Sequence, residues 1–194
     1  MKLPALAGLC ALVLAAASAQ ATVTSYYTTM TPEGAGGRTG TGQATATFDS
    51  VTHILHFSAS FSGLSGLTTA SHFHCCTTTP FTGNALVAVD SPTLNIPLGV
   101  TAGTFGSDLD LDDVDALGVA TNFNPAFVTA SGGLAQAISA FAAGLNSGRV
   151  YLNIHSTTFP GGEIRGYMLV PEPSSAALSL LALAALAGLR RRRR

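Results

Sequence analysis

The sequence is poor in charge and in the residues on which many binding classes depend. It has no tryptophan, and only 10% of its residues are charged. Lys2 is the only lysine, and between residues 22 and 170 three arginines stand against nine acidic residues, a formal charge of −6. Phosphate backbones are bound by clustered Lys and Arg, so we expect no nucleic-acid partner.

Cysteine is equally scarce, with three in the chain. Cys10 lies in the N-terminal apolar stretch, which leaves Cys75 and Cys76 as an adjacent pair, too few for a disulfide framework. Neighbouring side chains on a strand point to opposite faces. We expect a vicinal disulfide or two free thiols, while a His2Cys metal site that joins Cys76 to His72 and His74 is the third alternative.

The N-terminus has the pattern of a secretory signal. Lys2 precedes the apolar stretch Leu6 to Ala17, and two small-residue triplets, Ala17-Ser18-Ala19 and Ala19-Gln20-Ala21, follow it. Each triplet is a site of the kind that signal peptidase cleaves. Residues 1–21 are therefore predicted to be a signal peptide.

The C-terminus carries a short polar motif, an apolar run and a basic end. Pro171, Glu172 and Pro173 precede the run Ser174 to Leu189, which is followed by Arg190 to Arg194. As a helix the run would be about 24 Å long, shorter than a hydrocarbon core of roughly 30 Å. It predicts a temporary transmembrane segment in residues 171–194, with the arginines on the cytoplasmic side and the domain outside.

This tail resembles the PEP-CTERM sorting signal of Gram-negative bacteria. The resemblance rests on Val170-Pro171-Glu172-Pro173, the Ser/Ala/Leu helix and the arginine cluster. It implies removal of the tail by an exosortase-type enzyme and delivery to the cell surface or an exopolysaccharide matrix. Extracellular polysaccharide or a surface protein would then be the partner.

Residues 22–170 have the length of one domain and the pattern of an all-β fold. Apolar and polar residues alternate over short runs broken by Gly and Pro. In the run from Val51 to Ser62, for example, Val51, Leu55 and Phe57 are predicted to share a buried face. Strands are expected at Val23–Thr29, Gly42–Phe48, Val51–Ser62, Thr69–Cys75, Ala85–Asp90, Gly103–Leu109, Arg149–His155 and Glu163–Val170.

One segment has helical rather than strand spacing. Leu134, Ile138, Phe141 and Leu145 recur at intervals of three and four residues. Ser131 is a candidate N-cap for this helix. One short helix is therefore expected to cross the sandwich.

The domain resembles the CHRD (chordin-type) family. The resemblance rests on Gly42 to Asp49 with the strand that follows it, on Ser71-His72-Phe73-His74, and on Tyr151 to His155 with Phe159 to Gly166. It implies an antiparallel Greek-key β-sandwich of immunoglobulin-like or superoxide-dismutase-like type. It also implies an extracytoplasmic module with no established reaction, and we expect no enzyme.

Three histidines form a candidate metal site. On a strand His72 and His74 point to the same side about 7 Å apart, and His155 lies on another strand. Imidazole suits Cu or Zn, so a metal-binding protein or a superoxide-dismutase-like enzyme is the alternative function. A further histidine placed like the bridging ligand of those dismutases is missing. The competing interpretation has the imidazoles hydrogen-bonded to backbone and to one another.

The last motif is a charged pair beside a turn. Glu163 and Arg165 follow Pro160-Gly161-Gly162 and are predicted to form an ion pair that closes the final hairpin, with loop carbonyls as the alternative acceptors for Arg165. A phosphate-binding loop, a nucleophile elbow and a dinucleotide fingerprint are all lacking. The sequence thus predicts an exported structural or binding module with a removable tail.

Overall fold

A computed structural model describes residues 22–171, so the predicted signal peptide and nearly all of the sorting tail, Glu172 and Pro173 included, lie outside the described residues. Within that range the chain forms eight strands and three helices. Their bounds are β1 Val23–Pro32, β2 Thr41–Asp49, β3 Ile54–Ser62, β4 Thr68–Cys75, β5 Leu86–Val89, α1 Ser91–Leu94, β6 Gly103–Asp110, α2 Pro125–Ser131, α3 Leu134–Asn146, β7 Tyr151–Ser156 and β8 Ile164–Tyr167.

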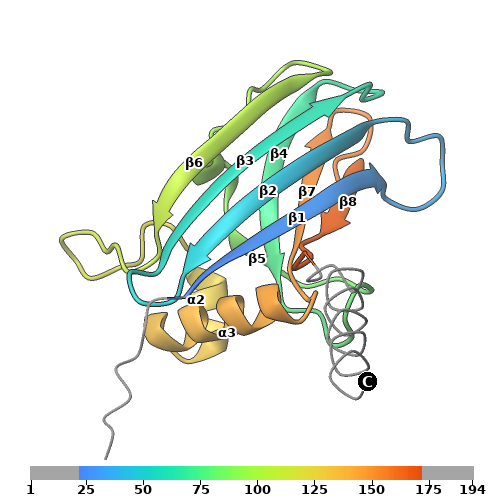
Figure 1. The fold of residues 1–194 in the computed structure, drawn as a ribbon. Helices are drawn as coiled ribbons and strands as arrows, with labels where there is room; N and C mark the ends of the chain where they lie inside the picture. Colours follow the sequence, from blue (N-terminus) through green and yellow to red (C-terminus); the bar gives the residue numbers. More distant parts are fainter. Residues whose placement is uncertain (1–21, 172–194) are drawn as a thin grey trace, which may run out of the picture.

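The strands form one curled antiparallel sheet in the order β5-β4-β7-β8-β1-β2-β3-β6. Figure 1 shows it as two layers, with β1, β2, β3 and β6 in front of β4, β5, β7 and β8. β1 joins the layers, because Val23 to Met30 pair with β2 while Thr31 and Pro32 pair with β8. The all-β sandwich prediction is confirmed.

Aromatic side chains fill the space between the layers. The ring of Phe57 on β3 meets that of Phe73 on β4 edge to face, with 5.3 Å between centroids. Phe73 also packs against Phe141 of α3, at 6.1 Å. The helix therefore covers one end of the sandwich, as Figure 1 shows, and shields its core from water.

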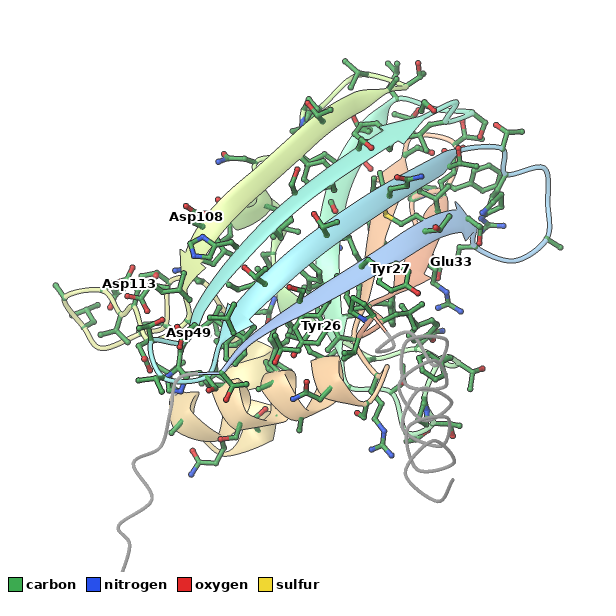
Figure 2. All side chains as sticks on the ribbon, viewed as in Figure 1. Tyr26, Tyr27, Glu33, Asp49, Asp108 and Asp113 are labelled. Carbon is green, nitrogen blue, oxygen red and sulfur yellow. A yellow bond between two sulfur atoms is a disulfide. The ribbon has the colours of Figure 1, made fainter. Side chains whose placement is uncertain are left out.

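The buried alternation predicted for β3 holds from Leu55 onward but fails at Val51. Leu55 is 0% exposed, whereas Val51 is 55% exposed. The reason is a turn at residues 50–52, whose backbone amides at Val51 and Thr52 donate to the carboxylate of Asp49 (labelled in Figure 2). His53 then adopts a positive φ of 52° before β3 begins.

The prediction of a single helix was incomplete. The helix with the predicted apolar stripe is α3, but α1 and α2 precede it in the described range. Ser131 ends α2 instead of capping α3, since Gly132 at φ 92° is the C-cap of α2 and Gly133 is the N-cap of α3. The sequence feature that marks the start of α2 is the N-cap Asn124 followed by Pro125 at the first helical position.

The described residues contain no single helix long and apolar enough to cross a membrane. Only α2 and α3 taken together, with a bend of 92° between them, reach that length and hydropathy.

Candidate metal centre

The outer face of the back layer carries the three predicted histidines. β4 and β7 pair antiparallel, with His72 opposite Asn153 and Ala70 opposite His155. Side chains alternate along β4, so Phe73 enters the core at 0% exposure while His72 and His74 point outward. His155 is the diagonal neighbour of His72 across the strand pair, a spacing that brings long side chains into contact.

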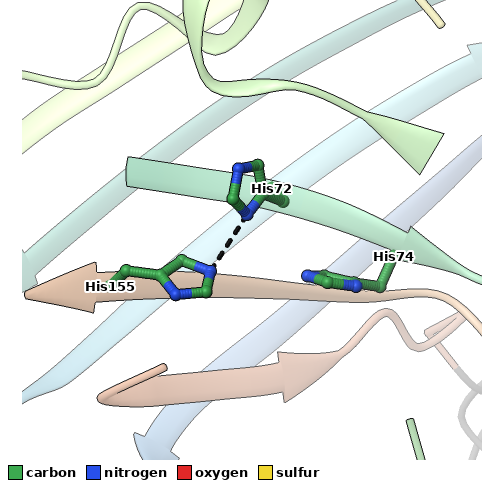
Figure 3. Close-up of side chains that lie close together, drawn as sticks. All are labelled: His72, His74 and His155. Atoms are coloured by element: carbon green, nitrogen blue, oxygen red, sulfur yellow. Dashed lines mark hydrogen bonds between the residues drawn. The ribbon is translucent and has the colours of Figure 1, made fainter. Parts of the chain in front are cut away.

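The structure brings these three side chains together (Figure 3). One ring nitrogen from each of His72, His74 and His155 lies within 4.8 Å of the others. His72 Nδ1 is 2.9 Å from His155 Nε2. The ring of His72 is also edge-on to that of His74, with centroids 5.7 Å apart.

Two of the imidazoles are held by backbone carbonyls. His155 Nδ1 donates to the oxygen of Pro160 at 2.7 Å, and His74 Nδ1 donates to that of Ala85 at 2.9 Å. A carbonyl only accepts, so in both rings the proton is assigned to Nδ1 and the lone pair to Nε2. The competing interpretation from the sequence, with imidazoles bonded to backbone and to one another, thus matches part of the same geometry.

His74 also has an unused nitrogen. Its ring is stacked on that of Tyr151 at 4.6 Å, and its Nε2 is buried without a hydrogen-bond partner among the described residues. Glu33 Oε2 and Asn153 Oδ1 on the same face are buried and unpartnered too. Buried polar atoms in native proteins nearly always have partners. The Asn153 side chain lies near enough to His74 to raise the pKa of that ring, and bound water or a cation would complete the bonding of these atoms.

Burial favours the neutral form of His72 and His74. Burial first, and then the neighbouring His155 and His74, together lower the pKa of His72 to about 4, against the opposing charge of Asp90. Burial also lowers the pKa of His74, against the Ala85 hydrogen bond, which raises it. Neutral imidazole is the form that binds metal ions.

Arg165 stands beside this cluster, with a partner different from the predicted one. Its Nη1 is 3.2 Å from Glu33 Oε1 and donates to the Gly83 oxygen at 3.1 Å and to Asn84 Oδ1 at 3.0 Å. Its guanidinium also lies 5.1 Å from the centroid of the Tyr151 ring. The sequence did not single out Glu33, whose partner is distant along the chain.

The predicted ion pair between Glu163 and Arg165 was wrong. β8 begins only at Ile164, so the alternation that would place both side chains on one face does not reach Glu163. The Glu163 carboxylate instead accepts from the amide and hydroxyl of Ser65, at 2.5 and 2.6 Å. Although burial alone raises the pKa of Glu163, hydrogen bonds from Ser156 and Ser65 outweigh it and lower that pKa.

The adjacent cysteines lie at the end of β4, against α3. Their sulfurs are bonded to each other as a vicinal disulfide. The Ala140 oxygen is 3.7 Å from Cys75 Sγ and 3.3 Å from Cys76 Sγ. The cluster of ligand atoms contains the three histidines without Cys76.

The fold and the cluster define a class, an all-β domain with three converging histidines on one face of its sheet. The model of the CHRD domain family matches residues 19–168, and that of the PEP-CTERM protein-sorting motif matches residues 169–194. The chain therefore belongs to the CHRD family and carries a PEP-CTERM tail. Neither the curated proteins nor the solved structures gave a match. The two predicted resemblances are confirmed, and the tail makes this an exported protein sorted by an exosortase.

Proposed function

We propose that this protein is a cell-surface or matrix module that binds one Cu²⁺ or Zn²⁺ ion through His72, His74 and His155. The observation that carries the proposal is the convergence of three ring nitrogens within 4.8 Å on the face of β4 and β7 that does not carry Phe73. Two of these rings already give their other N–H to a carbonyl. Metal-ligating histidines almost always have such an outer partner, which fixes the ring and its tautomer.

The spacing of the nitrogens suits a small ion. Metal–nitrogen bonds of ~2.0–2.1 Å in a tetrahedral site put ligand nitrogens roughly 3.4 Å apart. The nitrogens of His72 and His155 are 2.9 Å apart, and the third lies within 4.8 Å of both. Side-chain rotations that move the ring nitrogens by about 1 Å would bring all three to bonding distance, without any change in the strands.

The donor set selects the class of metal. Imidazole nitrogens suit zinc and copper, whereas Mg²⁺ and Ca²⁺ take oxygen ligands. Three protein nitrogens leave a fourth position of a tetrahedral ion for water or for an outside ligand. Among the described residues, the nearby carboxylates Glu33 and Asp90 lie outside the converging group.

A surface location agrees with the charge of the domain. Residues 22–170 carry a formal charge of −6, and tryptophan is lacking, so direct binding of acidic polysaccharide and stacking on sugar rings have little support. A bound cation would give this face a positive centre for a carboxylate of the matrix or of a surface protein. The proposed partner is therefore one that bears acidic groups.

The experiment that tests metal binding is equilibrium dialysis of the full chain, purified without a polyhistidine tag, against micromolar ZnCl₂ or CuSO₄. Elemental analysis should find about one ion per chain, and His74→Ala should lose it. His56→Ala is the matched control, because His56 is paired with Asp108 at 2.7 Å in the front layer and should leave the content unchanged. An unsubstituted protein that retains neither metal overturns the proposal.

A further inference from the structure

The hydrogen bond between His72 and His155 conflicts with a three-histidine site. His155 Nδ1 donates to Pro160, so its Nε2 carries the lone pair, and the 2.9 Å contact requires His72 Nδ1 to donate to it. In this arrangement the His72 Nδ1–H is hydrogen-bonded to the lone pair of His155 Nε2. Neither nitrogen can then bind an ion, although their residues both belong to the converging group.

Asp90 stands on the other side of the His72 ring. Its Oδ1 is 4.0 Å from His72 Nε2, beyond hydrogen-bond distance. In the metal-free tautomer that nitrogen carries a lone pair and faces a carboxylate, which offers it no proton. The carboxylate is held in place because its Oδ2 accepts from Asn124 Nδ2 at 2.8 Å.

We propose that metal binding switches the tautomer of His72, with Asp90 as the positioning residue whose carboxylate accepts a hydrogen bond from the relocated N–H. This inference rests on the proposed function. The ligand atoms are then His72 Nδ1, His74 Nε2 and His155 Nε2. His72 changes from the Nδ1–H form to the Nε2–H form, and the Nε2–H donates to Asp90.

The proton balance closes within one ring. One proton leaves His72 Nδ1 to solvent and one arrives from solvent at Nε2, so the ring stays neutral and no net proton is released. The partly exposed His72 side chain, with 18% of its surface accessible, allows this exchange. After the switch, and once Asp90 Oδ1 has approached His72 Nε2 from 4.0 Å to hydrogen-bond distance, each of the three rings has its non-ligating N–H on an oxygen of Ala85, Pro160 or Asp90, the kind of outer partner that metal-bound histidines have.

The direct test is ¹⁵N NMR of the histidine rings in the full chain, in detergent, with and without Zn²⁺. Long-range ¹H–¹⁵N correlations distinguish the two tautomers. We expect His72 to be in the Nδ1–H form without metal and in the Nε2–H form with one equivalent of Zn²⁺, while His74 and His155 stay Nδ1–H. Zinc binding with His72 unchanged would overturn the inference and leave the proposed function standing, whereas failure to bind zinc would overturn both.

The second test uses the isosteric variant Asp90→Asn. Loss of the carboxylate should raise the Kd for Zn²⁺ about 10-fold or more, the usual effect of removing an outer partner. Asp108→Asn is the matched control, since it makes the same change in a histidine–carboxylate pair of the front layer and should leave the Kd within a factor of two. An Asp90→Asn variant that binds zinc as tightly as the control contradicts the role of Asp90. The NMR result on the unsubstituted protein remains decisive if the variant does not fold.

Discussion

Arg165 illustrates how much one side chain connects in this domain. It joins Glu33 after β1 to the 83–84 loop and covers Tyr151, so four segments meet at its guanidinium. The side chains of the ion pair are only 24% and 17% exposed, which places the pair between the surface and buried cases. Removal of this pair should therefore lower the free energy of unfolding by more than the loss of an exposed pair does.

We predict that Arg165→Ala lowers the free energy of unfolding by about 1–3 kcal/mol, because Glu33 is left half-buried without its cation. Chemical denaturation followed by circular dichroism measures this change. Arg149→Ala, at an exposed arginine, should have little effect. Equal stability of the two variants would show that the ion pair contributes nothing.

The candidate site shows what single residues reveal in a sequence. His72, His74 and His155 could be found because period-two alternation fixes the facing of strand residues. Glu33, Asp90 and Asn153 could not, since their roles depend on the register of β4 against β7 and on loops that bring distant segments together. The Glu163–Arg165 pairing failed for a local reason, the start of β8 one residue later than the alternation required.

Among the elements, α3 lies close against the end of β4. It carries Gly144 in its last turn, and a Cβ there would lie 2.8 Å from Cys76 Sγ, 2.9 Å from Cys75 Sγ and 3.0 Å from Val150. Glycine in a helix normally costs about 1 kcal/mol relative to alanine. Here its absent side chain allows the helix to lie against the cysteine pair.

Gly144→Ala should consequently destabilise the domain by roughly 1–3 kcal/mol, although alanine is the better helix former. Thermal unfolding monitored by circular dichroism is the measurement. The control is Ser139→Ala, an exposed position on the same helix, which should be neutral or slightly stabilising. If Gly144→Ala is the more stable of the two, the helix has room to move away from the cysteines.

Elements were predictable wherever the pattern of burial is regular. All eight strands and α3 could be recognised from the regular spacing of their apolar residues, because one face of each meets the common core. α1 and α2, with 4 and 7 residues, are too short for a periodic stripe and are marked only by the Pro residues at their starts. The strand order is a property of pairing between distant segments, which no local pattern contains.

At the scale of the whole molecule, the domain and its tail have separate tasks. Residues 19–168 match the domain family and residues 169–194 the sorting motif, so the boundary falls directly after the last strand. The two ends of the chain are predicted to direct export and to be absent from the mature protein.

We predict that mature protein extracted from the cell surface lacks the residues after Pro171-Glu172-Pro173, because the sorting enzyme removes the tail. Intact-mass spectrometry measures it. A Glu172→Ala variant, altered in the motif, should retain the tail and stay in the membrane fraction. Surface-extracted protein that still ends at Arg194 would contradict the prediction.

The pairing of β1 with β8, which joins the two layers, determines when the sheet can close during secretion. β1, the first strand of the domain to emerge from the membrane, pairs with β8, the last, through Thr31 with Arg165 and Pro32 with Ile164, and Tyr27 bridges to Leu169. The sheet cannot close until nearly the whole domain has been translocated. The sorting tail follows directly in the sequence. We therefore expect the fold to be completed at about the time when the predicted anchor enters the membrane.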